Sequence, residues 1–167
     1  MNLDPGFSHL GPRGARMVDV GDKEISARGA IARARVRVGR KVADAIHEDA
    51  VAKGRVLDVA RLAGIQAAKR TAELIPLCHA IPIDLVSVDL EVDGERIEIR
   101  AEVRSRSRTG VEMEAMTAAS VAALTVYDMC KAIDRGIVLE SIHLDEKWGG
   151  KSGPYRRQDR VDGAPSA

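Results

Sequence analysis

Apolar and polar side chains alternate in four separate stretches of the chain. The first stretch covers residues 30–38, where Ala30, Ala32, Ala34, Val36 and Val38 fall on one side and Ile31, Arg33, Arg35 and Arg37 on the other. The same period recurs in residues 83–92, 96–103 and 137–144. A period of two predicts strands with one buried face. The Asp93-Gly94 pair between the second and third stretches predicts a tight turn, and so an antiparallel hairpin.

Three stretches between these strands favour helices. Residues 40–53 predict a short helix that Gly54 ends. A second helical segment runs from there to Pro76, and one arc of its helical wheel carries Leu57, Leu62, Ile65, Ala68 and Ala72. The longest predicted helix covers residues 111–134, contains no charged residue from Ala115 through Tyr127, and is capped by Gly136. Because a helix that is apolar all round must be covered on more than one side, we expect it to pack on the sheet and to face a partner subunit.

The order of these elements is strand, helices, two strands, helix, strand. This order predicts an α+β fold of the ferredoxin-like kind, an antiparallel sheet with helices packed on one face. Residues 17–153 are expected to form a single catalytic domain, since 167 residues suit one domain. The flanking residues 1–16 and 154–167 are rich in Gly, Pro, Ser and charge, which predicts flexible N-terminal and C-terminal tails.

Charge and cysteine content narrow the function classes. The 26 basic and 25 acidic side chains nearly cancel, so no global field favours nucleic acid or an anionic membrane as a partner. No stretch approaches the roughly 20 apolar residues of a membrane-spanning helix, and the first residues do not resemble a signal peptide. Cys78 and Cys130 are too few for a disulfide framework. We therefore expect a cytoplasmic protein with reduced thiols.

Two loop segments carry candidate chemistry. Leu77, Cys78 and His79 follow Pro76, and the histidine can exchange protons near neutral pH, although an isolated histidine is more often a packed side chain. Residues 149–153 resemble a phosphate-binding loop of the Walker type. That pattern, however, needs a glycine at position 145, where this chain has aspartate, and a helix after the loop, where it has Pro154. The nucleotide-triphosphatase interpretation therefore fails. A glycine-rich segment remains, in which Lys147 and Lys151 can bind an anion.

The longest predicted helix carries charges at both of its ends. Glu112 and Glu114 open it, where carboxylates also suit the helix dipole. Asp128 and Lys131 stand three residues apart near its end, so both can meet one ligand. The chain has 19 arginines but only seven lysines, and Lys53, Lys131, Lys147 and Lys151 all lie at segment boundaries or in motifs. Lysine releases a proton more readily than arginine does, so this distribution favours proton transfer.

Several spaced motifs together resemble one known family. The motifs are GIQAAKRT at residues 64–71, LIPLCH at 74–79, GVEMEA at 110–115, YDMCKA at 127–132 and GGKSG at 149–153. They closely resemble the cyclic pyranopterin monophosphate synthases (MoaC family) of molybdenum cofactor biosynthesis. The resemblance begins at residue 17 and ends at residue 153, so it spans the predicted domain.

The resemblance implies a specific reaction and assembly. It implies a lyase that needs neither metal nor cofactor. The substrate would be a cyclised guanosine triphosphate, (8S)-3',8-cyclo-7,8-dihydroguanosine 5'-triphosphate, which the enzyme rearranges to cyclic pyranopterin monophosphate with release of pyrophosphate. It also implies a homohexamer, built as a trimer of dimers, with active sites at subunit interfaces. These features agree with the helix expected to face a partner.

The resemblance also implies roles for single residues. Asp128 matches the active-site acid or base, and Lys53 and Lys131 match catalytic lysines. The substrate-binding set is Leu77, Cys78, His79, Met113, Glu114 and Lys147, to which we add Glu112 and Lys151 from the same motifs. The chain departs from many relatives at Ala80-Ile81, where they carry Pro-Leu, at Trp148, where they carry serine, and at Arg16, where some carry histidine. Neither Ala80-Ile81 nor Trp148 removes an ionisable group, so activity is still expected.

Two alternatives remain open on the sequence alone. The first is a ferredoxin-like module that senses a nucleotide without transforming it; such a sensor needs anion contacts but not Asp128 beside Lys131 and Lys53. The second is a nucleic-acid binder that uses Arg33, Arg35 and Arg37. Balanced charge and only four aromatic residues disfavour the second, and we expect that arginine face to be solvated.

Overall fold

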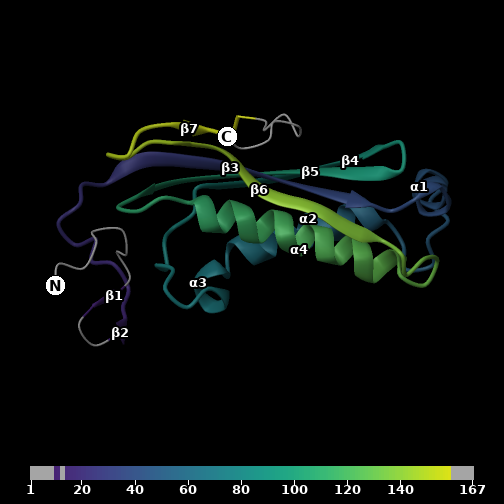
Figure 1. Ribbon diagram of the computed structural model, residues 1–167, viewed down its shortest axis with the longest axis horizontal. Helices are drawn as coiled ribbons and strands as arrows, with labels where there is room; N and C mark the ends of the chain where they lie inside the picture. The colour runs from purple at the N-terminus through teal and green to yellow at the C-terminus, as the bar shows by residue number, and fades with distance from the viewer. Residues whose placement is uncertain (1–9, 12–13, 159–167) are drawn as a thin grey trace, which may run out of the picture.

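The protein forms two layers, an antiparallel sheet and a set of helices beneath one of its faces (Figure 1). The computed structural model describes residues 10–11 and 14–158. Its sheet has the order β4-β5-β3-β6-β7, with β3 Ser26–Arg37, β4 Leu85–Asp93, β5 Arg96–Ser107, β6 Val138–Trp148 and β7 Tyr155–Arg156. The helices are α1 Arg40–His47, α2 Val56–Ala68, α3 Thr71–Leu74 and α4 Glu112–Cys130. A separate pair joins β1 Leu10–Gly11 to β2 Gly14–Ala15.

This arrangement confirms the α+β, ferredoxin-like fold with helices on one face. The hairpin of β4 and β5 forms as the Asp93-Gly94 turn predicts, and the first long strand, β3, lies between β5 and β6. Most of the two predicted tails lies outside the described residues, so their flexibility and the limits of the domain stay predictions. Within the described part, β7 pairs with the end of β6 and so adds a short edge strand after residue 153.

The alternation in β3 separates the core from an ion-paired outer face. Its even-numbered residues from Ala30 to Val36 are buried, whereas Arg33, Arg35 and Arg37 lie on the outer face of the sheet. These arginines form cross-strand ion pairs: Arg33 with Asp145 at 2.5 Å, Arg35 with Glu98 at 2.5 Å and Arg37 with Glu140 at 3.1 Å. The face is therefore neutralised by its own acids as well as solvated, which removes the basis for a nucleic-acid surface.

The helical layer is held together by small residues. The buried positions of α2 are Val56, Ala60, Gly64, Ala67 and Ala68. A Cβ on Gly64 would lie 2.9 Å from the backbone oxygen of Ala118 in α4, so the two helices touch almost backbone to backbone. The predicted arc is therefore only partly buried: Ala68 belongs to the core and Leu57 and Ile65 pack against it, but Leu62 is 67% exposed. At this separation the larger side chains of α2 do not fit between the helices and turn outward.

Three element boundaries differ from their predictions. Helix α1 ends at His47 instead of residue 53, because Asp49 adopts a left-handed φ of 51° that a helix cannot continue through. The second segment divides into α2 and the short α3. Helix α4 ends at Cys130 and not at residue 134. The backbone N–H of Gly136 instead donates to the side chain of Asp134 at 2.7 Å, which closes a turn before β6.

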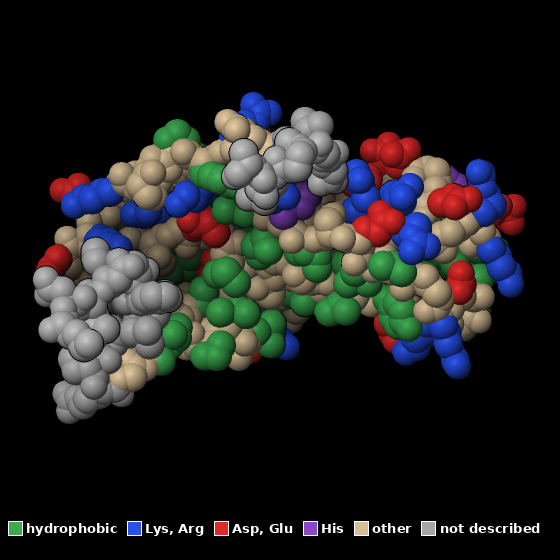
Figure 2. Space-filling model, viewed as in Figure 1, with side chains coloured by type: hydrophobic (Ala, Val, Ile, Leu, Met, Phe, Trp, Pro, Cys, Tyr) green, Lys and Arg blue, Asp and Glu red, His purple; other side chains and the backbone are tan. Residues whose placement is uncertain are grey.

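The outer side of the helical layer exposes apolar side chains. Figure 2 shows hydrophobic side chains gathered over the helical layer, while charged side chains crowd the end of the molecule that carries α1. Val59 and Leu62 of α2 and Leu124 of α4 are among the exposed large hydrophobic residues. The contact of α4 with a partner subunit stays a prediction, and these side chains are where such a contact would form. Within the described ranges, no helix is long and apolar enough to span a membrane.

Candidate functional site

The predicted site residues form two groups, one at each end of α4. Figure 1 shows the N-terminal end of this helix near α3 and its C-terminal end near the turn into β6. Glu112 and Asp128 are 16 positions apart on the helix. At 1.5 Å per residue, the two groups lie about 24 Å apart within one chain.

At the C-terminal end of α4, the three predicted catalytic residues meet. The Asp128 carboxylate accepts a hydrogen bond from the Lys53 ammonium at 2.8 Å and one from the Lys131 ammonium at 2.6 Å. Lys53 comes from a loop 75 positions earlier in the chain. The hydrogen bonds from Lys131 and Lys53 lower the pKa of Asp128 to about 2. This exposed carboxylate is therefore ionised at every physiological pH.

Local folding explains why Lys53 reaches this end. The loop after α1 turns tightly, with the N–H of Gly54 donating to the oxygen of Val51 at 2.8 Å, and the buried side chain of Val51 fixes the turn. Gly54 has a φ of 93°, which favours glycine. The Lys53 ammonium also donates to the backbone oxygen of Asp128 at 2.7 Å. A cation suits that position, because carbonyl groups of the last helical turn have no partner in the helix.

At the N-terminal end of α4, six predicted substrate-binding residues line one pocket of about 500 Å³. They are Leu77, Cys78 and His79 from the loop after α3 and Glu112, Met113 and Glu114 from the first turn of α4. Val18, Val20, Lys23, Ile75, Thr109 and Gly110 complete the lining. The apolar walls and convergent polar groups are typical of a small-molecule site.

Glu114 is the unusual side chain of this pocket. It is only 3% exposed, and its Oε2 atom is buried without a hydrogen-bond partner among the described residues. Burial, and to a lesser degree the charge of Glu112, raise the pKa of Glu114 to about 7. A carboxyl group with this pKa takes up and releases protons near neutral pH, as a general acid or base must.

The neighbouring loop presents a histidine and a thiol to the same pocket. His79 Nε2 lies 2.8 Å from the carbonyl oxygen of Val18. Because a carbonyl only accepts, Nε2 donates in this contact and Nδ1 of the neutral ring remains an acceptor. Burial first, and then the charge of Glu114, raise the pKa of the Cys78 thiol. Cys78 is therefore a neutral lining group.

Lys147 of β6 does not line this pocket but contacts Glu112, one of its lining residues. Its ammonium lies 3.1 Å from Glu112 Oε1 and donates to Ser152 Oγ at 3.1 Å. A Cβ on Gly110 would fall 1.8 Å from a carboxylate oxygen of Glu112, so the absence of a side chain there lets Glu112 fold back over the loop. Lys147 thus links the first turn of α4 to the glycine-rich segment.

The last predicted residue, Lys151, lines a second hollow of about 560 Å³ beside the first. Its other lining residues are Lys23, Glu24, Ser26, Arg28, Gly150 and Ser152, and Lys23 lines both hollows. Neither Lys23 nor Arg28 was among the predicted site residues. Lys23 was detectable as one of only seven lysines, whereas Arg28 was hidden among 19 arginines. Three cations against one carboxylate make this hollow suited to an anion.

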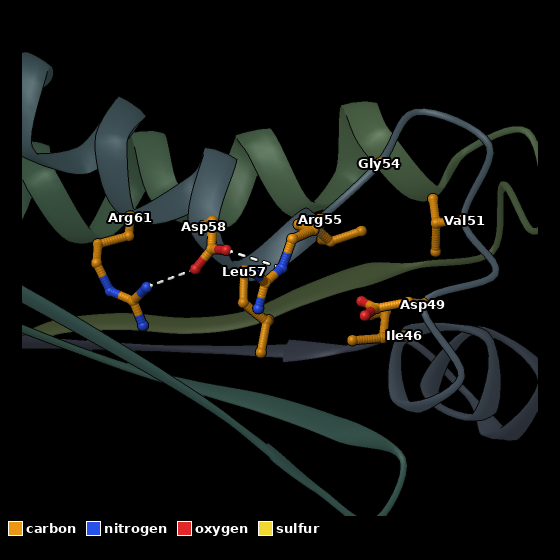
Figure 3. Close-up of a pocket in the computed structure, with 9 residues that line it drawn as sticks. Ile46, Asp49, Val51, Gly54, Arg55, Leu57, Asp58 and Arg61 are labelled. Atoms are coloured by element: carbon orange, nitrogen blue, oxygen red, sulfur yellow. Dashed lines mark hydrogen bonds and ion pairs between the residues drawn. The ribbon is translucent and has the colours of Figure 1, made fainter.

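A third hollow, of about 260 Å³, lies between the loop after α1 and the start of α2 (Figure 3). Its Asp58 carboxylate is paired with Arg55 at 3.0 Å and with Arg61 at 2.9 Å. With Asp49, which also lines the hollow, the two acids and two arginines cancel, and none of the predicted site residues lines it. It therefore offers less chemistry than the two ends of α4. Over residues 10–11 and 14–158, no group of three or more His, Cys, Asp or Glu side chains could hold a metal ion.

Known proteins resemble this chain over nearly its whole length. A protein-family model described as the MoaC family matches residues 17–150. A protein named cyclic pyranopterin monophosphate synthase from Bordetella avium is 56% identical over 155 residues, which cover 91% of this chain and 96% of that protein. Proteins of the same name from Thermomicrobium roseum and Peptoclostridium acidaminophilum are 56% and 50% identical, over 92% and 91% of this chain and 94% and 98% of their own.

Proposed function

This chain belongs to the MoaC family, and we propose that it is a cyclic pyranopterin monophosphate synthase. It converts a cyclised guanosine triphosphate to cyclic pyranopterin monophosphate and pyrophosphate, as a lyase of molybdenum cofactor biosynthesis. One observation carries the proposal. Lys53, Asp128 and Lys131, the three residues predicted to be catalytic, meet within 2.6–2.8 Å although Lys53 comes from a distant loop. A module that only senses a nucleotide has no need of this cluster.

The chemistry that the reaction requires is available at the two ends of α4. Closing the cyclic phosphate forms a bond between a substrate hydroxyl oxygen and the first phosphorus, and breaks the bond from that phosphorus to the leaving pyrophosphate. The hydroxyl proton passes to a base, for which the pKa of Glu114, about 7, is suited. The electron pair leaves with pyrophosphate, and lysine ammonium groups stabilise that charge. The hollow with Lys23, Arg28 and Lys151 can accept the departing anion.

We further propose that the two ends act together across a subunit interface. The two groups lie at opposite ends of one helix, so a second copy must bring its Asp128 cluster to the pocket that holds Glu114. The exposed apolar side chains of Val59, Leu62 and Leu124 support such an assembly. Burial of these side chains would stabilise it. A homohexamer built as a trimer of dimers fits this requirement. A stable monomer in sedimentation at micromolar concentration would refute it.

The activity is tested by supplying the cyclised guanosine triphosphate and measuring pyrophosphate and the cyclic pterin product. We expect turnover by the wild type and none by Asp128→Asn or Lys53→Ala, with fold and assembly retained. Asp58→Asn is a matched control, because Asp58 is also an exposed carboxylate held by two cations. Absence of product from the assembled wild type overturns the function. Normal turnover by both variants overturns the site.

The shared site is tested by mixing two inactive variants. Glu114→Gln disables one half of each site and Asp128→Asn the other half. After the two variants are dissociated and reassembled together, sites that pair an intact Glu114 with an intact Asp128 from another subunit should regain activity. Two variants with the same substitution should regain none. If the mixture stays inactive although hybrid assemblies form, the two ends do not share a site.

The location in the cell follows as part of the same proposal. Both Cys78 and Cys130 are free thiols. Free thiols persist in the reducing cytoplasm, which is where we place the protein.

A further inference from the structure

The end of β6 is fastened to the start of β3 by an aromatic ring that lies over a glycine. Gly29 of β3 and Trp148 of β6 are direct partners in the sheet. A Cβ on Gly29 would fall 2.0 Å from the Trp148 ring, closer than any side chain can come. The indole therefore occupies the space above the Gly29 backbone, and any residue other than glycine would displace it.

A third strand fixes the other edge of this contact. Arg104 of β5 is the partner of Gly29 on its other side, and its guanidinium carbon lies 6.0 Å from the centre of the Trp148 ring. Arg104 is itself held by Glu102, a carboxylate only 8% exposed, at 2.5 Å. A cation over an indole is attractive. The ring of β6 is thus held by groups from β3 and β5 on the outer face of the sheet.

Successive side chains of a strand point to opposite faces, so this contact determines the direction of the preceding residue. With Trp148 on the outer face, Lys147 points to the inner face, where it pairs in register with Ala30 and meets Glu112 at 3.1 Å. A lysine side chain has several rotatable bonds and does not fix its own position. The strand must therefore be fixed by its neighbours.

The glycines after Trp148 continue the same close contact. A Cβ on Gly149 would fall 2.2 Å from the backbone oxygen of Ala27, and a Cβ on Gly150 would fall 2.2 Å from the guanidinium of Arg28. Both glycines have positive φ, 85° and 74°. The segment that follows Lys147 is thus laid flat against β3 at the edge of the pocket.

We propose that Trp148 is a positioning residue that, by its contact with Gly29, holds the Lys147 ammonium at the substrate pocket. The inference rests on the proposed function, which makes that pocket the substrate site. The contact between Trp148 and Gly29 does not depend on that function. Loss of the ring frees the end of β6 and moves Lys147 away from Glu112. Substrate binding then weakens, while the acid-base groups on α4 remain in place.

The kinetic test compares Gly29→Ala, Trp148→Ala, Trp148→Phe and the double variant Gly29→Ala/Trp148→Ala. We expect Gly29→Ala and Trp148→Ala each to raise KM by roughly ten-fold with little change in kcat. Trp148→Phe, which keeps a ring over the glycine, should lie near the wild type. The double variant should match Trp148→Ala alone, because no ring remains to be displaced. If Trp148→Ala has the KM of an active wild type, the inference is wrong and the proposed function stands.

A second measurement separates the two proposals even without turnover. Trp148 is the single tryptophan of the chain, so its fluorescence reports on this contact alone. Titration of the assembled protein with pyrophosphate should change the emission, and Lys147→Ala should weaken the apparent affinity several-fold. Gly29→Ala should shift the emission before any ligand is added. Emission that neither pyrophosphate nor Gly29→Ala alters would overturn the positioning role, whatever the activity assay shows.

Discussion

The two ends of α4 place carboxyl groups in opposite environments. At the first end, Glu114 is buried and its Oε2 atom has no partner among the described residues. At the last end, Asp128 is exposed and held by Lys53 and Lys131. The pKa of Glu114 is raised to about 7, whereas that of Asp128 is lowered to about 2. One helix therefore carries one carboxyl group that titrates near neutrality and one that stays charged.

This contrast shows that local surroundings outweigh the helix dipole. The positive N-terminal end of α4 favours a carboxylate there by about 0.3–1 kcal/mol, which is less than one pKa unit. Burial raises the pKa of Glu114 from 4.5 to about 7 against this effect. The negative C-terminal end disfavours a carboxylate, yet the two lysines lower the pKa of Asp128. The neighbours of each carboxyl group thus set its protonation state.

The largest effect on activity is expected when the titratable carboxyl group of Glu114 is removed. Glu114→Gln keeps the shape of the side chain but cannot accept a proton. If Glu114 is the base, kcat should fall by about 10²–10⁴-fold. Glu91→Gln, at an exposed position of β4, is the control and should leave kcat unchanged. A Glu114→Gln enzyme with wild-type kcat would show that the buried carboxyl group is only structural.

The same contrast predicts opposite effects of pH on stability. Because the folded pKa of Glu114 is raised above its ordinary 4.5, its contribution is complete below that pH and is lost as pH rises through about 7. Asp128 has a lowered pKa, so its contribution is present above 3.8 and is lost only as pH falls through about 2. Between pH 5 and 8, only Glu114 of this pair changes.

Unfolding in urea at fixed protomer concentration measures the effect. The wild type should lose roughly 2–3 kcal/mol more unfolding free energy between pH 5 and pH 8 than Glu114→Gln does. Asp128→Asn should show the same pH dependence as the wild type in this window. Equal pH dependence in the wild type and Glu114→Gln would contradict the raised pKa.

The pH dependence of kcat/KM should also reveal the ionisation of Glu114. As a base, Glu114 must be ionised, so kcat/KM should rise about ten-fold per pH unit below 7 and level off above it. Glu114→Gln should lose this limb, whereas residual activity of Lys131→Ala should retain it. A limb that persists in Glu114→Gln would belong to another group of the site.

The sequence predicted the elements well where a simple period decides them. The alternation of Ala30 to Val36 with arginines leaves only one orientation for β3, and the Asp93-Gly94 turn fixes the hairpin. The face of α2 was predicted only in part: Leu57, Ile65 and Ala68 do meet the core, but periodicity also favoured Leu62, which is exposed. The actual contact needs Gly64 against Ala118, and the exposed Leu62 follows from that close approach. Helix ends also depend on single backbone angles such as that of Asp49.

For the site, motifs selected the right neighbours but not their arrangement. The sequence joined Asp128 to Lys131 by helical spacing, and the resemblance added Lys53. The sequence placed Glu114 and Asp128 at opposite ends of one predicted helix, but it did not indicate which side chains surround each carboxyl group, because those side chains come from other elements. Lys23 carried no motif, and the contact of Trp148 with Gly29 depends on the pairing of β3 with β6.

The two ends of α4 should also differ, by a smaller amount, in the reactivity of their cysteines, Cys78 near the first turn and Cys130 in the last. Cys130 is fully buried and burial raises its pKa to about 11, so a thiol reagent should not reach it in the folded protein. Cys78 is only partly buried and lines the pocket at the first end, so it should react slowly because its pKa is also raised. Mass spectrometry after alkylation distinguishes the two sites. Pyrophosphate bound beside this pocket should slow the labelling of Cys78 several-fold and leave Cys130 unlabelled. Labelling of Cys130 before Cys78 would mean that the last turn of α4 opens more readily than the pocket. The C-terminal end of α4 would then be the more accessible of the two, against this prediction.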